Sequence, residues 1–344
     1  MVPAELRAVD IPFASQAAIE PTPTAIESLP ELLQRLATTG EPSWIVEGLI
    51  PDGISMIHAQ PREYKSLIAQ SLLVSLATGT PAFGLERLAV GDPAPALYVT
   101  EEDSARRVAQ RFEQFLAGAN LMVPDCLHVA ATKGINLDIP EHQDGLIAQT
   151  KRHGYRLVTL DPVRSLTACA DQGPRELKPF TDFLRRFLRE TGAALLLVHH
   201  DTKPQNLPDN RRRPQRASGG GIFSICDNPI AVDPVDTVSR LLNPTAFKFC
   251  EDPAPIVVRL EHGAGWLRLT GSETSGTAGT DAALDLRILD YLQHSPFAFG
   301  SNIAKGAHAR KSEVLQRLEV LLKDGKVDSL QERRGTKWML RREL

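Results

Sequence analysis

The pattern that decides the fold lies between Ile54 and Ala77, in the sequence ISMIHA QPREY KSLIAQSLLVSLA. Its first six residues, Ile54–Ala59, form a short apolar run typical of a buried strand. A polar loop follows, and Ser66–Ala77 then has apolar residues at helical spacing. A strand that leads through a short loop to the start of a helix is the local arrangement that binds phosphate groups, because the backbone N–H groups at the helix start are unpaired.

The loop corresponds position by position to the phosphate-loop pattern G-x-x-x-x-G-K-[ST], with Ala59 and Tyr64 in the two glycine places. Lys65 supplies the cation for the terminal phosphates, and Ser66 supplies the hydroxyl for magnesium. Tyr64 keeps its backbone N–H but costs ~1–2 kcal/mol if the left-handed region is required there. The predicted nucleotide-binding residues are Gln60, Pro61, Arg62, Glu63, Tyr64, Lys65 and Ser66.

Short apolar runs alternate with helical segments over most of the chain. This alternation predicts an α/β fold with a mainly parallel sheet and helices on both faces. The predicted strands are Ile54–Ala59, Ala96–Thr100, Leu157–Leu160 and Ala194–Val198, with Ala246–Phe249 and Ile256–Leu260 extending the sheet. The predicted helices are Ser66–Ala77, Ser104–Ala117 and Arg175–Thr191.

Polar side chains follow three of these strands directly. Leu157–Leu160 ends in Asp161, a carboxylate that can hold magnesium through water, and Ala96–Thr100 ends in three carboxylates, of which Glu102 can activate the attacking water. Ala194–Val198 ends in His199 and His200, which can sense a terminal phosphate. Because ligands of parallel sheets gather at the carboxyl ends of the strands, these groups are expected to converge on the phosphate loop. Taken singly, each of them is better explained as a solvated turn residue, and it is their occurrence together and in order that favours a site.

Taken in order, these motifs resemble the RecA-fold family of plasmid and phage replicative helicases, the RepA-like hexameric ATPases. The family pattern is a W-x-x-x-G-L-x-P entry, a phosphate loop, Y-x-x-x-E-D, a strand ending in D-P, and V-H-H-x-x-K. The matching segments here are Trp44–Pro51, Ala59–Ser66, Tyr98–Asp103, Leu157–Pro162 and Val198–Lys203. The resemblance covers about two thirds of the chain, from Trp44 to Leu269.

The resemblance implies ATP and Mg²⁺ as cofactors and a hexameric ring with nucleotide sites between subunits. It implies catalysis by Glu102, metal coordination by Ser66 and Asp161, and phosphate sensing by His199 or His200. The family also has a trans-acting K-x-R pair, of which this chain has Lys248 but has Cys250 in place of the arginine. An arginine of this kind is worth about 10³–10⁵ in rate in well-studied phosphoryl-transfer enzymes, so its absence bears on turnover.

A basic segment without apolar periodicity follows His200. In RecA-like rings the corresponding loop faces the central channel, so we expect single-stranded DNA to contact it through phosphates. A solvated basic loop is the alternative. The candidate residues are Lys203, Arg211, Arg212, Arg213 and Arg216.

The chain is predicted to contain an N-terminal arm (1–43), a RecA-like ATPase core (44–270), a flexible Gly/Ser/Thr-rich linker (271–283) and a small winged-helix domain (284–344). The last assignment rests on three helical segments followed by a hairpin that turns at Arg334–Gly335. The winged helix is expected to bind either duplex DNA or a replication protein. Its candidate DNA contacts are Lys311, Arg317, Arg333 and Arg334.

The composition is that of an ordinary globular chain, with 42% hydrophobic and 24% charged residues and a net charge of −3. No apolar stretch approaches the ~18 residues of a membrane span, and the N-terminus lacks the apolar region of a secretory signal. The four cysteines are widely spaced, which argues against a disulfide framework or a zinc site. A cytoplasmic protein without a membrane partner is therefore expected.

These features together predict an ATP-dependent hexameric motor, a DNA helicase that acts on single-stranded DNA of a plasmid, phage or mobile element. Two other functions fit the same sequence. One is an accessory ATPase, such as a loader or recombination factor, that binds nucleotide as a switch with weak turnover. The other is a DNA-binding regulator whose ATPase core has lost its activity.

Overall fold

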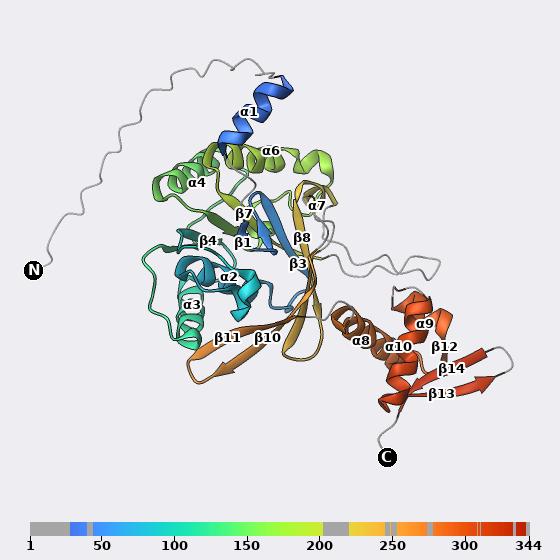
Figure 1. The fold of residues 1–344 in the computed structure, drawn as a ribbon. Helices are drawn as coiled ribbons and strands as arrows, with labels where there is room; N and C mark the ends of the chain where they lie inside the picture. The colour runs from blue at the N-terminus through green and yellow to red at the C-terminus, as the bar shows by residue number, and fades with distance from the viewer. Residues whose placement is uncertain are drawn as a thin grey trace, which may run out of the picture. The chain divides into compact units, whose positions relative to one another are not determined.

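The structure is a computed structural model that describes residues 28–39, 44–201, 220–244, 248, 253–273, 278–307, 309, 311–332 and 335–341 (Figure 1). The chain divides into two compact units, Met1–Pro42 and Ser43–Leu344, which are described separately. The expected DNA-contact residues Lys203, Arg211, Arg212, Arg213, Arg216, Arg333 and Arg334 lie outside the described residues.

A nine-stranded sheet forms the centre of the larger unit, in the order β11-β10-β9-β8-β3-β7-β6-β4-β5. The strands from β8 to β5 in this order run parallel, and β9, β10 and β11 continue the sheet in antiparallel orientation. The parallel strands are β3 (Ile54–Ala59), β4 (Ala96–Thr100), β5 (Leu127–Ala131), β6 (Leu157–Leu160), β7 (Ala194–His200) and β8 (Asn228–Pro234). The antiparallel strands are β9 (Ser239–Pro244), β10 (Ile256–Gly263) and β11 (Trp266–Glu273).

The four strands expected to surround the phosphate loop are confirmed, because β3, β4, β6 and β7 begin where their apolar runs begin. The expected strand at Ile256–Leu260 is the first part of β10. The expected strand at Ala246–Phe249 is not seen at Lys248, its one described residue, which lies in a bend. The observed α/β fold with a mainly parallel sheet is the predicted RecA-like arrangement.

Helices cover both faces of the sheet, as predicted. One face packs against α2 (Lys65–Thr78) and α3 (Ala105–Ala119), and the other packs against α6 (Pro174–Thr191) and α4 (Pro140–His153). Two short helices, α5 (Val163–Leu166) and α7 (Gly220–Ile225), lie on the second side. Because side chains of a strand alternate between faces, Ile57 and Val198 enter the first core whereas Met56 and Leu197 enter the second.

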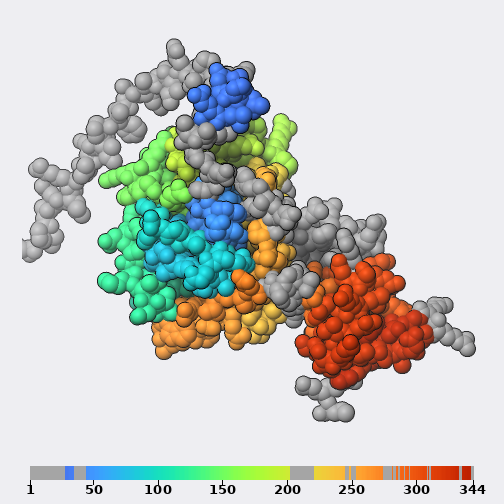
Figure 2. Space-filling model, viewed as in Figure 1, coloured from blue at the N-terminus to red at the C-terminus, as the bar shows by residue number. Residues whose placement is uncertain are grey.

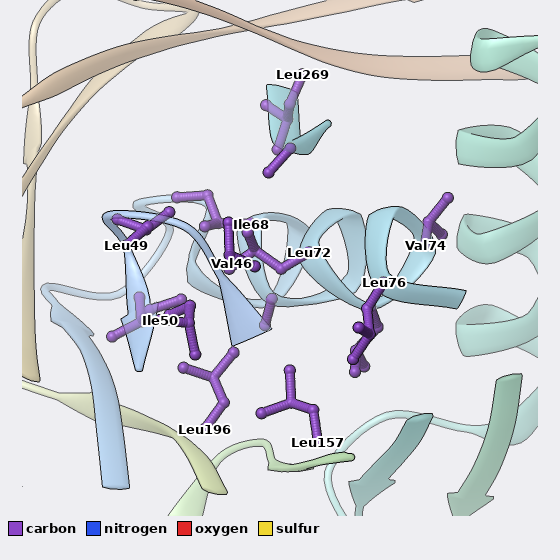
Figure 3. Close-up of a cluster of buried hydrophobic side chains, with 14 of the residues drawn as sticks. Val46, Leu49, Ile50, Ile68, Leu72, Val74, Leu76, Leu157, Leu196 and Leu269 are labelled. Carbon is purple, nitrogen blue, oxygen red and sulfur yellow. The ribbon is translucent and has the colours of Figure 1, made fainter. Parts of the chain in front are cut away.

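Helix α2 is buried on almost every side, which fixes the helix that begins at the phosphate loop. Figure 3 shows its residues Ile68 and Leu72 beside Val46 and Leu49 of the entry segment. That segment contains the short strands β1 (Trp44–Val46) and β2 (Ile50–Pro51), which form an antiparallel pair. Leu269 of β11 lies across α2 from the side chains of the central strands (Figure 3). The antiparallel end of the sheet therefore returns over the helix layer.

Within the larger unit, the described residues from 278 to 341 have a hydrophobic core of their own, which includes Ile288, Leu318 and Trp338. This part is called the C-terminal unit below. In the space-filling view these residues form a compact group, coloured red (Figure 2). Three helices and a three-stranded sheet with the order β12-β14-β13 build it. The elements are α8 (Ala278–His294), β12 (Ala298–Phe299), α9 (Gly300–Gly306), α10 (Lys311–Lys323), β13 (Val327–Glu332) and β14 (Gly335–Leu340). The expected three helices and hairpin are present.

The expected linker at 271–283 is wrong in its extent. Strand β11 continues to Glu273, and α8 already begins at Ala278. Gly271, which suggested flexibility, pairs with Val258, and a Cβ atom there would approach Leu85 Cδ1 to 2.6 Å. This glycine therefore permits close packing of a strand and does not mark a flexible segment.

The N-terminal unit contains helix α1 (Leu29–Thr39), within the segment expected to be an arm. Ser28 and Glu31 form a reciprocal cap: the Ser28 N–H donates to Glu31 Oε2 at 2.7 Å, and the Glu31 N–H donates to Ser28 Oγ at 3.5 Å. The backbone hydrogen bond from Ser28 lowers the pKa of Glu31. None of the described helices is long and apolar enough to cross a membrane.

Candidate nucleotide-binding site

A cavity of about 370 Å³ opens at the carboxyl ends of the parallel strands, beside the loop between β3 and α2. The expected residues with a chemical role that line it are Lys65, Ser66, Glu102, Asp161 and His200. Loop residues Pro61 to Tyr64 line it as well. The structure thus brings the predicted groups of four separate strands to one place.

Tyr64, which stands in the second glycine place of the loop, adopts a backbone conformation that favours glycine. Tyr64 has φ 58° and ψ 12°, the left-handed region, immediately before the first residue of α2. Arg62 also has a positive φ of 72°. The expected strain at Tyr64 is therefore present, since a residue with a Cβ atom pays about 1–2 kcal/mol for this region.

Contacts from the turn between β8 and β9 hold Tyr64 in this conformation. The Tyr64 hydroxyl donates to the carbonyl of Thr237 at 2.9 Å. The guanidinium carbon of Arg240 lies 4.1 Å from the centre of the tyrosine ring, a cation–π contact. Arg240 also forms an ion pair with Glu63, with 2.5 Å between Nε and Oε2. These contacts offset the cost of the left-handed tyrosine.

Lys65 is buried and folded back on its own loop. Its Nζ donates to the carbonyls of Ala59 at 3.1 Å and Gln60 at 2.7 Å. Burial lowers the pKa of Lys65, and the surrounding carboxylates, of which Asp201 and Asp161 contribute most, oppose that shift. The lysine is thus placed at the start of α2, where a phosphate group can replace the two carbonyls as the partner of its ammonium group.

Asp161 is fully buried at the end of β6 and receives two hydrogen bonds. The Tyr98 hydroxyl donates to Oδ2 at 2.6 Å, and Ser66 Oγ donates to Oδ1 at 3.1 Å. Burial raises the pKa of Asp161 from 3.8 to about 6, although both hydrogen bonds lower it. Burial likewise raises the pKa of Tyr98 well above its usual value, so this hydroxyl remains a donor.

The donor set fits magnesium. Mg²⁺ prefers oxygen ligands and is commonly held by one or two protein oxygens together with substrate phosphates and water. Ser66 Oγ and Asp161 Oδ1 are adjacent hard oxygens at the edge of the cavity. No group of three or more His, Cys, Asp or Glu that could hold a metal ion occurs within the described parts of the chain. A cation here would therefore depend on the nucleotide for its remaining ligands.

The three carboxylates after β4 have different surroundings. Glu101 accepts backbone N–H groups of Lys133, Gly134 and Ile135 at 2.9, 3.1 and 2.9 Å, so it fixes the loop after β5. Asp103 forms ion pairs with two arginines of α3, at 3.0 Å and 2.5 Å. Glu102 and Asp103 both line the cavity, but the charge of Asp103 is already paired with these two arginines. Of the three, Glu102 has the position of a water-activating base.

His199 and His200 are successive residues of β7 and lie on opposite faces of the sheet. Val198 packs in the core beside α2, so His200, two residues later, lies on that side and lines the cavity. His199 is fully buried and pairs in register with His58 of β3. Burial and the charge of Lys65 lower the pKa of His200 to about 4. The imidazole is neutral at pH 7, and of the two histidines His200 is the one placed to contact a phosphate.

Lys248 lies near the amino-terminal ends of β3 and β8, whereas the cavity lies at the carboxyl ends of the parallel strands. Its Nζ is 3.3 Å from the carbonyl of Ser224 and 3.4 Å from Asp227 Oδ1. Asp227 precedes β8, and its Oδ2 accepts the N–H of Ile54, the first residue of β3. The phosphate loop begins at the opposite end of this strand, six residues away at about 3.3 Å each. Lys248 therefore does not reach the site of its own chain.

The two described residues of the expected DNA contacts in the C-terminal unit differ in their surroundings. Lys311 is exposed at the start of α10. Arg317 instead bridges α10 and α8: it donates to Asp285 at 2.7 and 2.5 Å and to Asp281 at 2.9 Å. These two carboxylates balance its charge and satisfy its guanidinium. A structural role in joining the helices therefore fits Arg317 better than the expected DNA contact.

Sequence reasoning gave no role to Tyr98 or Arg240. Tyr98 was visible as part of the Y-x-x-x-E-D motif, and the alternation within β4 places it on the side of Asp161. Arg240 carried no signal, because its partners Glu63 and Tyr64 are more than 170 residues away in the chain. Asp201 also helps to position the start of the phosphate loop. Its N–H donates to the carbonyl of Ala59, and its carboxylate lies 2.8 Å from His58 Nδ1.

A parallel sheet with a lysine- and serine-bearing loop after one strand, a buried aspartate after another and a glutamate after a third defines a P-loop nucleotide triphosphatase. Comparison with known families agrees: residues 20–206 match the model of the family described as an AAA domain. The match covers more than half of the chain, so the protein belongs to this family of P-loop ATPases. Membership supports nucleotide binding, which typically involves Mg²⁺. No curated protein matches the chain.

Proposed function

We propose that this protein is an ATP-hydrolysing motor, a DNA helicase of the RepA-like type that works as a ring on single-stranded DNA. The proposed setting is the replication of a plasmid, a phage or another mobile element. The observation that carries the proposal is the convergence of Lys65, Asp161 and Glu102 on one cavity, despite the two missing glycines. A chain that only bound nucleotide would have no use for a carboxylate in the position of Glu102.

In this proposal each residue has a separate task. Lys65 leaves the carbonyls of its own loop and binds the terminal phosphates. Glu102 accepts the proton of the water that attacks the terminal phosphorus, and the neutral His200 donates a hydrogen bond to a phosphate oxygen. Ser66 and Asp161 would hold Mg²⁺, and the ion would supply positive charge beside the phosphate oxygens.

Ring formation is proposed from the position of Lys248. A lysine that acts on the nucleotide of a neighbouring subunit has to lie away from the site of its own chain, and Lys248 lies at the opposite end of β3. The sequence offers no arginine two residues later, where Cys250 stands. Lys248 would then be the main cation supplied to the neighbouring site by this segment.

A nucleotide switch with slow turnover is the second candidate, and the phosphate loop is the observation that favours it. The loop carries a carboxylate, Glu63, and a left-handed tyrosine, and Arg240 holds both. A loop held in this way can bind nucleotide yet adapt poorly to the transition state. The protein would then be an accessory factor such as a loader or a recombination protein.

The experiment that separates the two is an ATPase assay with and without single-stranded DNA, run beside a mass measurement with and without ATP. The motor requires turnover that single strands stimulate and an ATP-dependent ring, most simply a hexamer. A switch binds ATP with turnover that DNA does not raise. A monomer at micromolar concentration with both ATP and DNA present contradicts the ring.

A salt titration tests the proposed DNA contacts. Neutralising Arg211, Arg212 and Arg213 should weaken single-strand binding for every sequence and lower the salt slope by ~0.7 for each lost phosphate contact. Removing residues 281–344, which have their own core, should spare that binding and abolish duplex binding or recruitment of a partner protein. Loss of single-strand binding in the truncated protein alone would instead place the DNA site in the C-terminal unit.

A further inference from the structure

The phosphate loop is held from outside by four residues that we call the clasp: Glu63 and Tyr64 on the loop, and Thr237 and Arg240 beside the turn between β8 and β9. Arg240 is the centre of the clasp. It is 7% exposed, and its Nη1 donates to the carbonyls of Asp236 at 2.7 Å and Ser239 at 2.8 Å. These hydrogen bonds to nearby backbone carbonyls hold the guanidinium in place independently of its contacts with the loop.

The first task of the clasp is electrostatic. Glu63 places a carboxylate in a loop whose purpose is to bind anions, and it lines the cavity directly before Tyr64 and Lys65. Burial lowers the pKa of Lys65, and the charge of Glu63 is one of those that oppose this shift. Unpaired, this carboxylate would repel the phosphates and compete with them for the lysine. The ion pair with Arg240 cancels that charge at 2.5 Å.

The second task is conformational. Tyr64 stands in the glycine place with φ 58°, a conformation that a tyrosine leaves readily unless it is held. Arg240 covers one face of its ring, and Thr237 accepts its hydroxyl proton. Both contacts come from a turn that the antiparallel extension of the sheet keeps in place. The loop therefore keeps a nucleotide-binding shape without its glycine.

We propose that Arg240 is a positioning residue for nucleotide binding, which makes this glycine-free loop competent by neutralising Glu63 and holding Tyr64. The proposal rests on nucleotide binding at the site described above, and it adds a part of the chain, the turn between β8 and β9, that lies outside the matched family region of residues 20–206. Arg240 acts through the loop, since it contacts Glu63 and Tyr64 and is not itself among the residues that line the cavity.

The test is equilibrium binding of ATP and ADP to the full-length protein, measured with fluorescent analogues and by calorimetry. Arg240→Gln should weaken ATP binding about tenfold, because it leaves the Glu63 carboxylate uncompensated beside the phosphates. The loss should be larger for ATP than for ADP, which has one phosphate fewer. The double variant Glu63→Gln/Arg240→Gln should recover ATP binding to within about threefold of wild type, since the repelling charge is gone.

Two further variants keep the test informative if Arg240→Gln is poorly folded. Glu63→Gln alone removes the carboxylate from the loop and should bind ATP a few times more tightly than wild type, because Arg240 then adds an unopposed positive charge. Arg268→Gln on β11, an exposed arginine of the same sheet, is the matched control and should bind ATP like wild type. Thermal unfolding of each variant measures folding separately.

Three results would overturn the proposal. They are unchanged ATP binding in Arg240→Gln, equal losses for ATP and ADP that Glu63→Gln does not relieve, and a loss of ATP binding in Glu63→Gln alone. The first would show that the loop needs no clasp, and the second that Arg240 serves only the fold. If wild type itself binds no ATP, the proposed function fails, which is a different outcome from wild-type binding that Arg240 does not affect.

Discussion

Asp161→Asn should stabilise the nucleotide-free protein while it damages the site. Burial raises the pKa of Asp161 from 3.8 to about 6, so the carboxylate is charged at neutral pH at a cost to the folded state. A difference of about two pH units corresponds to about 3 kcal/mol, at 1.36 kcal/mol per unit. An asparagine keeps the shape, accepts the Tyr98 hydroxyl proton with its carbonyl oxygen, and donates its amide to Ser66.

The sign of the pH dependence follows from the raised pKa. Between about pH 4 and pH 6 the folded protein holds a proton on Asp161 that the unfolded chain has released. The contribution of this group to stability is therefore complete below pH 4, falls as the pH rises to 6, and stays constant above. From about pH 4.5 to pH 7 the wild type should lose about 2 kcal/mol relative to Asp161→Asn.

The assay is urea denaturation of both proteins without Mg²⁺ at about pH 4.5 and pH 7, followed by circular dichroism. The difference between the two proteins, compared at the two pH values, removes the titration of every other group. A second measurement adds Mg²⁺ and ATP, which should stabilise the wild type and have little effect on Asp161→Asn. Equal stabilities at both pH values would refute the conclusion that a buried charge is held at this position in the empty site.

Three other changes have defined outcomes. Lys65→Ala should weaken ATP binding about a hundredfold, since it removes a charged donor to the phosphates, and unchanged affinity in a titration would exclude the phosphate-loop assignment. Lys248→Ala should lower DNA-stimulated turnover much more than ATP affinity, because its place at the far end of β3 suits a neighbour's site, and parallel losses in both assays would remove that role. Arg317→Ala should destabilise the C-terminal unit by about 2 kcal/mol, because Asp281 and Asp285 lose their partner, and should leave DNA affinity unchanged. Amide hydrogen exchange in α8 and α10 measures the loss of stability, and a DNA titration measures the affinity.

The sequence predicted the parallel core well because its strands are short, mostly apolar and bounded by polar turns. Strands β3, β4, β6 and β7 are buried along their full lengths apart from the last residue of β7, so composition alone marks them. Strand β5 was missed because it lies at the sheet edge and is only partly buried. Helix α4 was missed because its segment has few apolar residues, of which Leu146 and Ile147 are buried.

The candidate site divides in the same way. Glu102 and Asp161 come just after strands, and Ser66 follows the loop after β3. Parallel strands bring their carboxyl ends to one edge, so local pattern and topology were enough to group these residues. Arg240 was given no role and Arg317 was expected to contact DNA, since the role of an arginine depends on which carboxylate or ring lies opposite it in the fold. The linker was overestimated for a related reason: Gly271 suits close packing against Leu85 as well as it suits flexibility.

The most direct test of the central claim is hydrolysis by Glu102→Gln compared with Asp103→Asn. The claim is that Glu102 activates water at a site that binds ATP, whereas Asp103, which lines the same cavity, has its charge paired with arginines of α3. Single-turnover hydrolysis and ATP affinity are measured for both variants with single-stranded DNA present. We predict that Glu102→Gln binds ATP like wild type and loses at least about a hundredfold in hydrolysis, whereas Asp103→Asn stays within a few-fold. Wild-type hydrolysis by Glu102→Gln would contradict the claim.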